Sequence, residues 1–455
     1  MYDKIEKALK SSKADYTEIR VERRESTTVT YRGKDLEEAS AVIDAGGMVR
    51  CLVKKGGWGV VTFNNLDELE ARVDQAYQCA RVAQNEEPIP LAEIPVSRDE
   101  ITVALKHDFR AVSLTDKVAL AREYNAILLG HSDKIVDTRC IYSDSFSTVT
   151  LATSEGTRIR EERPLITIYF VAVARDGDNV QTAMEARSGQ NGFEFALGHE
   201  ALAQTAAQRA VDLLKAESVV GGQYPVVLNP RLAGVFIHEA FGHLSESDFV
   251  YENPRAREMM TLGRRFGPDI LTVFDDGSLA GLRGTHPYDD EGTPTGRADL
   301  IKNGILVGRL HSRETAARMG ERPTGNARAQ NYRHRPIVRM TNTAIEGGTT
   351  SFEDMLKEIK LGVYACDMYG GNTMLENFSF SSAYAYMIRD GQIAEMVKDV
   401  ILAGNLFTTL NNIDAIGNDF EWSQAGGMCG KGGQSVPVTF GAPHVRIQNV
   451  MVGGK

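Results

Sequence analysis

The segment Phe236–His243 contains a histidine–glutamate pair, His238 and Glu239, and ends in a second histidine. Imidazoles bind transition metals, and a glutamate beside such a ligand can accept a proton. In the zincin pattern H-E-x-x-H, two histidines lie about 40° apart around a helix and reach one metal. Here the spacing is one residue longer, which separates them by about 140° on a regular helix. They converge only if the helix widens or ends between them, and Gly242 favours such a break.

His238 and Glu239 also have a simpler interpretation. His238 would be a hydrogen-bonded core histidine, and Glu239 a surface charge on a short helix, which is the usual arrangement for an isolated pair. His199-Glu200 is such a pair, with no histidine four or five residues beyond His199, and we assign it no function. The spacing alone leaves both interpretations of the first pair open.

A metal site needs a third protein ligand, and Cys429 is the best candidate in the sequence. It lies in the glycine-rich segment 426–433, where glycines let the backbone curl closely and Lys431 favours the thiolate that binds metal. The alternative is a glycine-rich turn that contains a small apolar cysteine. The segment is not a Walker phosphate loop, because Ala425 and Gly432 stand where that pattern requires glycine and serine or threonine.

Two other charged segments could bind ligands. The carboxylates of Asp289-Asp290-Glu291 could hold a hard cation or a substrate amine. A solvated acidic turn is the usual alternative, and it is what we expect for Asp275-Asp276-Gly277. The arginine-rich run 322–339 could bind an acidic partner or a carboxylate terminus, although internal ion pairs are the expectation in an acidic protein.

Hydrophobic periodicity predicts the elements that position these residues. Alternating, β-branched runs predict strands within 16–63 and 134–185, and the stretch 86–99, with three prolines, should be extended. Apolar residues at helical spacing predict helices at Leu66–Gln84, at Leu114–Leu129 with Thr115 as N-cap and Gly130 as C-cap, and at Glu194–Ala216. Beyond residue 221, one helical window at 233–245 precedes a long series of short strands and turns.

This order of elements predicts an α+β fold, because few strand–helix–strand alternations are present. We divide the chain into residues 1–105, 106–220 and 221–455. The first two are expected to be small sheet-plus-helix units that together form an α+β N-terminal part, and the third a large, mostly antiparallel β domain.

Composition excludes several classes of protein. With 455 residues, 42% hydrophobic and 25% charged, the chain can bury a large core and fits neither a disordered protein nor a bundle of membrane spans. A net charge of −10 disfavours nucleic-acid binding. The five cysteines are widely spaced, so no disulfide framework is expected. Without a signal-peptide pattern at the N-terminus, we expect a soluble, cytoplasmic protein.

Several motifs together resemble the TldD/PmbA family of metalloproteases, also called modulators of DNA gyrase. In family order, they are HEAFGHLSESD from His238, DDEGTPTG from Asp289, RPTGNAR from Arg322, RMTNT from Arg339 and the glycine-rich run 426–454. They extend over about half of the chain, and the N-terminal half matches more loosely. The resemblance is strongest to the TldD-like, catalytic branch, since the TldE/PmbA-like branch lacks the H-E-x-x-x-H motif.

The resemblance implies a role for each motif residue. His238, His243 and Cys429 would be ligands of one divalent metal, most simply zinc, and Glu239 the catalytic acid/base. It also implies a metallopeptidase that cuts small or unfolded peptides inside an enclosed cleft of a dimer, either a homodimer or a heterodimer with a TldE/PmbA-like subunit. An extended peptide would bind there as an added strand, with little sequence preference.

Two alternatives remain at this stage. The chain could be a non-catalytic subunit that binds peptides or supports a catalytic partner, and it would then hold no metal. The family's older name suggests a link to gyrase or DNA, which the net charge and the lack of a helix-turn-helix disfavour. Iron or cobalt would also suit two histidines and a cysteine, so the sequence does not fix the metal.

Overall fold

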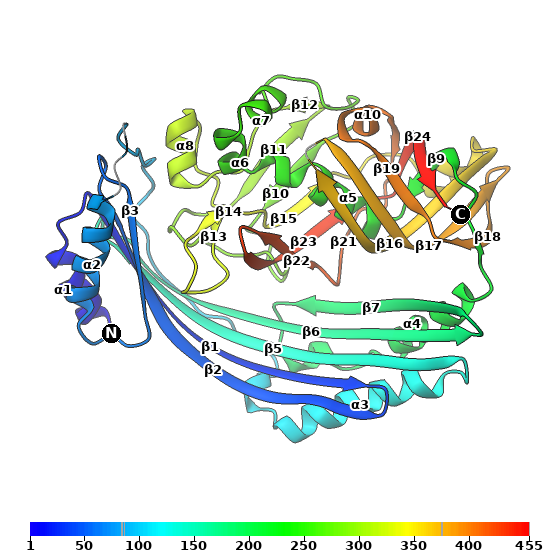
Figure 1. Ribbon diagram of the computed structural model, residues 1–455, viewed down its shortest axis with the longest axis horizontal. Coiled ribbons are helices and arrows are strands. Elements are labelled where there is room, and N and C mark those ends of the chain that lie inside the picture. Colours follow the sequence, from blue (N-terminus) through cyan, green and yellow to red (C-terminus); the bar gives the residue numbers. More distant parts are fainter. Residues whose placement is uncertain (83–84, 86, 375, 455) are drawn as a thin grey trace.

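The computed structural model describes residues 1–82, 85, 87–374 and 376–454. Its N-terminal half is built on one long, curved, mainly antiparallel sheet (Figure 1). The sheet contains seven strands in the order β3-β2-β1-β5-β6-β4, with β7 also paired to β6. Their bounds are β1 Tyr16–Arg32, β2 Asp35–Leu52, β3 Trp58–Phe63, β4 Arg98–Ile101, β5 Ile135–Thr153, β6 Arg158–Asp176 and β7 Asn179–Gly189.

This sheet confirms the predicted strands and joins the two units that the sequence suggested were separate. Strand β1, from the first unit, pairs along its length with β5, from the second. The region is α+β as predicted, but one sheet replaces two small ones. Sequence periodicity identifies each strand and not its neighbour, because pairing depends on residues more than a hundred positions apart. The domain boundaries at 105 and 220 stay predictions.

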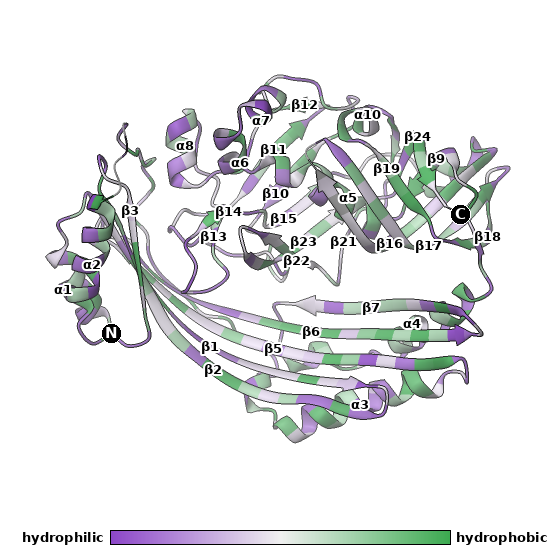
Figure 2. Ribbon diagram, in the orientation of Figure 1, coloured by the Kyte–Doolittle hydropathy of each residue, from purple (hydrophilic) through white to green (hydrophobic). Residues whose placement is uncertain are grey.

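Four helices cover one end and one face of the sheet. α3 (Leu114–Gly130) and α4 (Glu200–Leu213) pack on the face opposite the C-terminal half, where they bury apolar residues of the long strands (Figure 1). α1 (Tyr2–Ser11) and α2 (Leu69–Val82) close the end near β3. Buried residues alternate along β6, and the hydropathy colouring of the long strands alternates with them (Figure 2). The helices therefore leave the concave face free to meet the C-terminal half.

The predicted helices are present with different ends. α3 begins after Ser113, whose hydroxyl accepts a hydrogen bond from the Asp116 backbone, so Ser113 and not Thr115 is the N-cap. Its C-cap is His131, one residue beyond the predicted Gly130. The predicted helix 194–216 is a short 3-10 turn followed by α4, and residues 83–84 of the first predicted helix lie outside the described residues.

The C-terminal half is rich in strands, most of them antiparallel, as predicted. One sheet follows the order β12-β11-β10-β15-β23-β21 with β22 paired to β23, and the other follows β16-β9-β24-β19-β17-β18-β8 with β20 paired to β24. The strands of the first are β10 Val273–Asp276, β11 Arg297–Lys302, β12 Ile305–Leu306, β15 Asn342–Ile345, β21 Glu421–Trp422, β22 Gly427–Lys431 and β23 Gln434–Ala442. Those of the second are β8 Glu217–Ser218, β9 Gly222–Leu228, β16 Leu361–Met374, β17 Asn377–Arg389, β18 Gln392–Lys398, β19 Ile401–Asn405, β20 Ile413–Ile416 and β24 Val445–Gly453. A separate pair joins β13 (Ala327–Arg328) to β14 (Ile337–Val338).

Helix α5 (Pro230–Ala240) lies in the main core of this half, against β15, β16 and β23. It corresponds to the one helical window that the sequence predicts here. The structure adds short helices that the periodicity missed, since one or two turns give too few repeats to detect. They are α6 Ser247–Glu252, α7 Pro254–Met259, α8 Arg313–Met319, α9 Phe352–Lys357 and α10 Leu406–Asn411. Among the described residues, no helix combines the length and the apolar character that crossing a membrane requires.

The acidic segment 289–291 fastens the two halves together and is not a solvated turn. Asp290 lies 3.2 Å from Arg20 and 3.1 Å from Arg163, and Glu291 lies 2.6 Å from Arg50. All three arginines come from the curved sheet, and the carboxylates are buried. Ion pairing of this kind offsets the cost of removing the charges from water. The segment is therefore neither a free cation site nor a surface turn.

Candidate metal centre

Helix α5 carries His238 and Glu239 and ends at the position that brings His243 back toward them. Asn229 caps its start by accepting a hydrogen bond from the Leu232 backbone at 2.9 Å. A 3-10 turn, Gly242–Ser245, follows the helix directly. A Cβ at Gly242 would lie 2.1 Å from the sulfur of Met340, so any larger residue at this bend would require the buried Met340 side chain to move. Of the two possibilities that the spacing left, the helix ends and does not widen.

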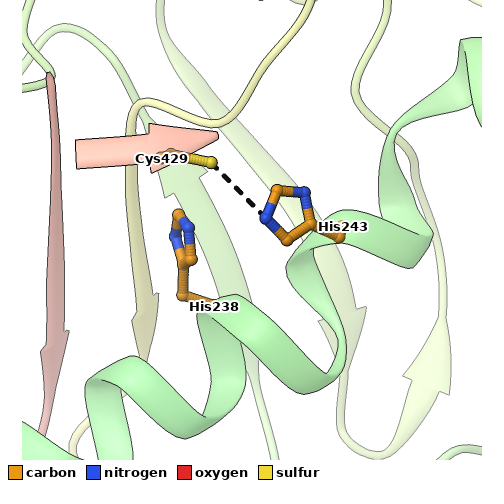
Figure 3. A group of neighbouring side chains, drawn as sticks. All are labelled: His238, His243 and Cys429. Atoms are coloured by element: carbon orange, nitrogen blue, oxygen red, sulfur yellow. Dashed lines mark hydrogen bonds between the residues drawn. The ribbon is translucent and has the colours of Figure 1, made fainter. Parts of the chain in front are cut away.

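The structure brings the three predicted metal ligands together. A nitrogen or sulfur of each of His238, His243 and Cys429 lies within 4.8 Å of the others. His243 Nε2 is 3.4 Å from Cys429 Sγ, and the two imidazoles face each other edge-on (Figure 3). Cys429 lies on β22, so a strand far along the chain completes a site that α5 begins. No other group of three such residues, in the described part of the chain, is close enough to bind one ion.

The chemistry of this group fits a metal such as zinc. Two imidazole nitrogens and one thiolate form a donor set typical of zinc sites with an open position. His238 is 2% exposed, and its Nδ1 is buried without a hydrogen-bond partner. An unpaired buried nitrogen is unfavourable, and a bound ion in contact with the imidazole would offset that cost.

The ionisation of the ligands also suits metal binding. Burial opposes ionisation of the Cys429 thiol, but the neighbouring imidazoles of His238 and His243 outweigh it and lower the pKa of Cys429 to about 5. For His243, burial disfavours the charged form, whereas Cys429 and Glu246 favour it and raise its pKa to about 10. The thiolate is therefore preformed, and a cation that displaces the His243 proton would take its place beside it.

Glu246 supports the site and was missed in the sequence. It is 1% exposed, and its Oε2 lies 3.0 Å from His243 Nδ1, which leaves His243 Nε2 to face Cys429. Burial raises the pKa of Glu246, but Lys431 and His243 outweigh it and hold the pKa below its usual value. Carboxylates in this position fix the ring and tautomer of metal-bound histidines. Its place three residues after His243 was the signal available in the sequence.

Lys431 has a different role from the predicted one. Its ammonium lies 3.1 Å from Glu246 and 2.6 Å from Asp248, so it neutralises these carboxylates. The low pKa of Cys429 comes from the two histidines and not from Lys431. The lysine contacts the carboxylate that orients His243.

Glu239 lies beside the candidate metal ligands. Its side chain is 34% exposed, and its Oε2 lies 3.8 Å from His243 Nε2. It lines a cavity of about 330 Å³ whose walls come from β6, β7, α5 and the loop before β22. A carboxylate beside the ligands and open to a cavity can exchange protons with a molecule bound there.

A second cavity continues the first along the concave face of the curved sheet. Its volume is about 560 Å³, and it shares four lining residues with the first, namely Thr167, Tyr169, Arg283 and Met428. Together they form a cleft between the curved sheet and the C-terminal half, which we call the intersheet cleft. The sequence did not predict that these residues line one cleft, because they come from segments that are far apart in the chain.

The arginine-rich run 322–339 mostly serves the structure, as predicted. Arg333 pairs with Asp44 of the curved sheet, and the buried Arg339 lies 4.0 Å from Glu246 and donates to the Cys429 carbonyl. The buried Asp275, expected in a solvated turn, instead lies in β10 and accepts hydrogen bonds from Thr341. All five cysteines are free, in agreement with the prediction of no disulfide framework.

Known protein families match the chain along most of its length. Residues 221–454 match the PmbA/TldA metallopeptidase C-terminal domain, residues 107–214 the central domain, and residues 17–80 domain 1. The chain belongs to the PmbA/TldD family of metallopeptidases. The resemblance found in the motifs is thus confirmed over all three parts.

Individual relatives agree with this assignment. A metalloprotease of Synechocystis sp. is 48% identical over 97% of this chain and 96% of its own length. A zinc metalloprotease TldD homolog of Saccharolobus solfataricus is 30% identical over 97% of both chains. Among solved structures, a Thermotoga maritima protein described as a modulator of a DNA gyrase has a TM-score of 0.82 at 20% identity, with both chains covered completely. At that identity, the likeness shows the fold alone.

Proposed function

We propose that this chain is a zinc-dependent peptidase with His238, His243 and Cys429 as metal ligands and Glu239 as general base. The observation that carries the proposal is that the three ligands converge beside a cavity into which Glu239 opens. The zinc metalloprotease name of the Saccharolobus relative supports the choice of metal. Iron is the alternative metal, because the same donor set also binds it.

The residues divide the work of hydrolysis. When bound, the metal supplies Lewis-acid chemistry, which lowers the pKa of water and polarises the scissile carbonyl. Glu239 accepts a proton from the attacking water and then delivers it to the leaving amine. Glu246 holds the His243 ring so that its Nε2 faces the ligand position. The intersheet cleft aligns the peptide with Glu239 and limits access of bulk water.

The proposed substrates are short or unfolded peptides. The cleft volumes suit an extended chain and not a folded domain. β22 pairs with β23 on one side, and among the described residues no other strand pairs with it. Its other edge offers backbone groups to which an extended peptide can add as a strand, beside Cys429. Recognition through the backbone accounts for little sequence preference.

A second subunit is part of the proposal, either a copy of this chain or a TldE/PmbA-like partner that would enclose the cleft. The segment 35–45 of β2 lies outside the part of that strand which pairs with β3. Val42 and Ile43 on this segment are 53% and 62% exposed. An open strand edge with exposed apolar side chains is a favourable site for subunit contact. Light scattering on the purified protein and on an Ile43→Lys variant would test this contact.

Elemental analysis is the first experiment. We expect about one zinc or iron per chain, lost in His238→Ala and in Cys429→Ala. His199→Ala is the matched control, because His199-Glu200 is a similar pair away from the site, and its metal content should not change. No metal under metal-replete conditions, or metal that both substitutions leave in place, would favour the non-catalytic, peptide-binding alternative.

Peptide hydrolysis is the second experiment. Glu239→Ala should keep its metal while cleavage falls by orders of magnitude. The wild-type protein should cut a denatured protein and spare its folded form. Retained activity in Glu239→Ala would remove Glu239 from the mechanism, and equal cleavage of both forms would contradict the enclosed cleft.

A further inference from the structure

Arg283 differs from the other buried arginines in the described part of the chain. Apart from Arg283 and Arg328, each has a carboxylate within 4.0 Å. Arg328 instead donates to two backbone carbonyl oxygens. Arg283 has poorer partners: its Nη1 donates to the Ala425 carbonyl at 3.2 Å, its Nη2 reaches the Met428 sulfur at 3.2 Å, and its Nε has none. Sulfur is a weak acceptor, so this guanidinium keeps unused donors.

The backbone around Arg283 is shaped to hold that side chain. Gly426 has φ of +58°, and a Cβ there would lie 2.4 Å from Arg283 Cδ. The Arg283 backbone N–H donates to Thr439 Oγ1 at 2.9 Å. Burial lowers the pKa of Arg283 to about 10, so it is charged at neutral pH. A buried cation without a counter-charge is unfavourable, and an anionic ligand would correct this.

Arg283 also lies where a substrate would bind. It lines both parts of the intersheet cleft, including the part that contains Glu239. Its guanidinium contacts Met428, the residue before Cys429. Standard bond lengths along that path place the guanidinium within about 14 Å of the Cys429 thiolate, the span of roughly four residues of extended chain.

We propose that Arg283 binds a carboxylate of the substrate and thereby determines where a peptide is cut. The proposal rests on the peptidase function above. The guanidinium fork matches a carboxylate in a two-point contact. A peptide whose C-terminal carboxylate lies on Arg283 would present a bond within about four residues of its C-terminus to the metal centre. An Asp or Glu side chain at the same place offers the same chemistry.

A binding experiment tests the contact separately from catalysis. The metal-loaded Glu239→Gln protein is titrated into three short fluorescent peptides of matched sequence, and anisotropy is measured. One has a free C-terminal carboxylate, one a C-terminal amide, and one an amide with glutamate as its last residue. We expect the free carboxylate to bind about tenfold or more tightly than the plain amide. The third peptide shows whether a side-chain carboxylate is accepted as well.

Variants then assign the preference to Arg283. Adding Arg283→Gln should make all three peptides bind equally, and Arg283→Lys, which keeps the charge without the fork, should keep part of the preference. Arg231→Gln is the matched control: Arg231 lines the same cavity but already pairs with Glu185 at 2.9 Å and Asp367 at 3.1 Å. It should leave the preference intact. The proposal would be overturned if the free-carboxylate peptide and the plain amide bound equally to the protein with Arg283 intact. A preference for the carboxylate that survives Arg283→Gln would also overturn it.

Product analysis separates this proposal from the peptidase function. Mass spectrometry of peptides cut by the active protein should show release of C-terminal fragments of about four residues or fewer. Cuts placed without regard to the carboxylate would contradict the role of Arg283. A carboxylate preference in binding without any hydrolysis would instead refute the peptidase function and leave Arg283 as a ligand-binding residue.

Discussion

Replacing Glu246 with glutamine should weaken metal binding while the fold is retained. Glutamine has the same shape as glutamate, and its amide oxygen can still accept a hydrogen bond from His243 Nδ1. In the wild type this nitrogen lies 3.0 Å from the Glu246 carboxylate. The negative charge is lost, and with it the stabilisation of a positively polarised His243. Removal of such a partner typically costs 10- to 100-fold in metal affinity, or about 1.4 to 2.7 kcal/mol. We expect the upper part of this range, because Glu246 is 1% exposed and solvent does not screen it.

The assay is competition for zinc with a chromophoric chelator at neutral pH, with folding checked by circular dichroism. Asp248→Asn is the matched control, since Asp248 is the other carboxylate on Lys431, at 2.6 Å, and does not contact His243. It should change zinc affinity by much less than Glu246→Gln. Unchanged affinity in Glu246→Gln, or an equal loss in both variants, would refute the reasoning that this carboxylate acts through the histidine.

Three further results are expected. Gly242→Ala should lower the free energy of unfolding by about 1–3 kcal/mol in urea titrations and reduce metal content, because its Cβ would meet Met340 at 2.1 Å; wild-type values would contradict the tight bend. Asp290→Asn should lower the free energy of unfolding by about 3–5 kcal/mol, because it leaves the buried Arg20 without its carboxylate partner, whereas Arg163 keeps Glu161 at 2.7 Å. Burial raises the pKa of Asp290, but these arginines outweigh it and hold the pKa below its usual value. The difference in the free energy of unfolding between the wild type and Asp290→Asn should therefore be constant above about pH 5 and shrink as the pH falls below about 4. A difference that stays constant at low pH would contradict the stabilising role of the Asp290 carboxylate. Removal of the metal with a chelator should lower the wild-type Tm and leave that of Cys429→Ala unchanged, since ligand binding stabilises only a protein that binds it.

The candidate site was predictable because its chemistry lies in short motifs. His238, Glu239 and His243 fall within six consecutive residues, so their relation depends mainly on local helix geometry. The sequence left open how the five-residue spacing could work. In the structure α5 ends at Ala240, a 3-10 turn begins at Gly242, and Met340 packs against that glycine. That contact joins residues almost a hundred positions apart, and local propensity does not contain it.

Charged segments were the least predictable part of the molecule. Asp290 and Asp275 were expected in solvated turns, yet both are buried. Sequence patterns predict that acidic residues near glycine lie at the surface, because a carboxylate without a cationic or hydrogen-bonding partner is most stable in water. Their partners, Arg20 and Thr341, are distant in sequence and become neighbours only in the folded chain. Arg283 was missed for the same reason, because the sequence does not show which arginines have a carboxylate partner in the folded chain.

The sequence by itself determined the family, the α+β class, the individual long strands and the candidate metal ligands. Each of these depends on residue type and on spacing within a few turns or one strand. Only the tertiary structure decided that two predicted units share one sheet, that Cys429 joins the histidines of α5, and that a cleft lined by Glu239 and Arg283 runs beside them. Those features arise from packing between distant segments, where burial, strand pairing and ion pairs are optimised together and no single segment specifies the result.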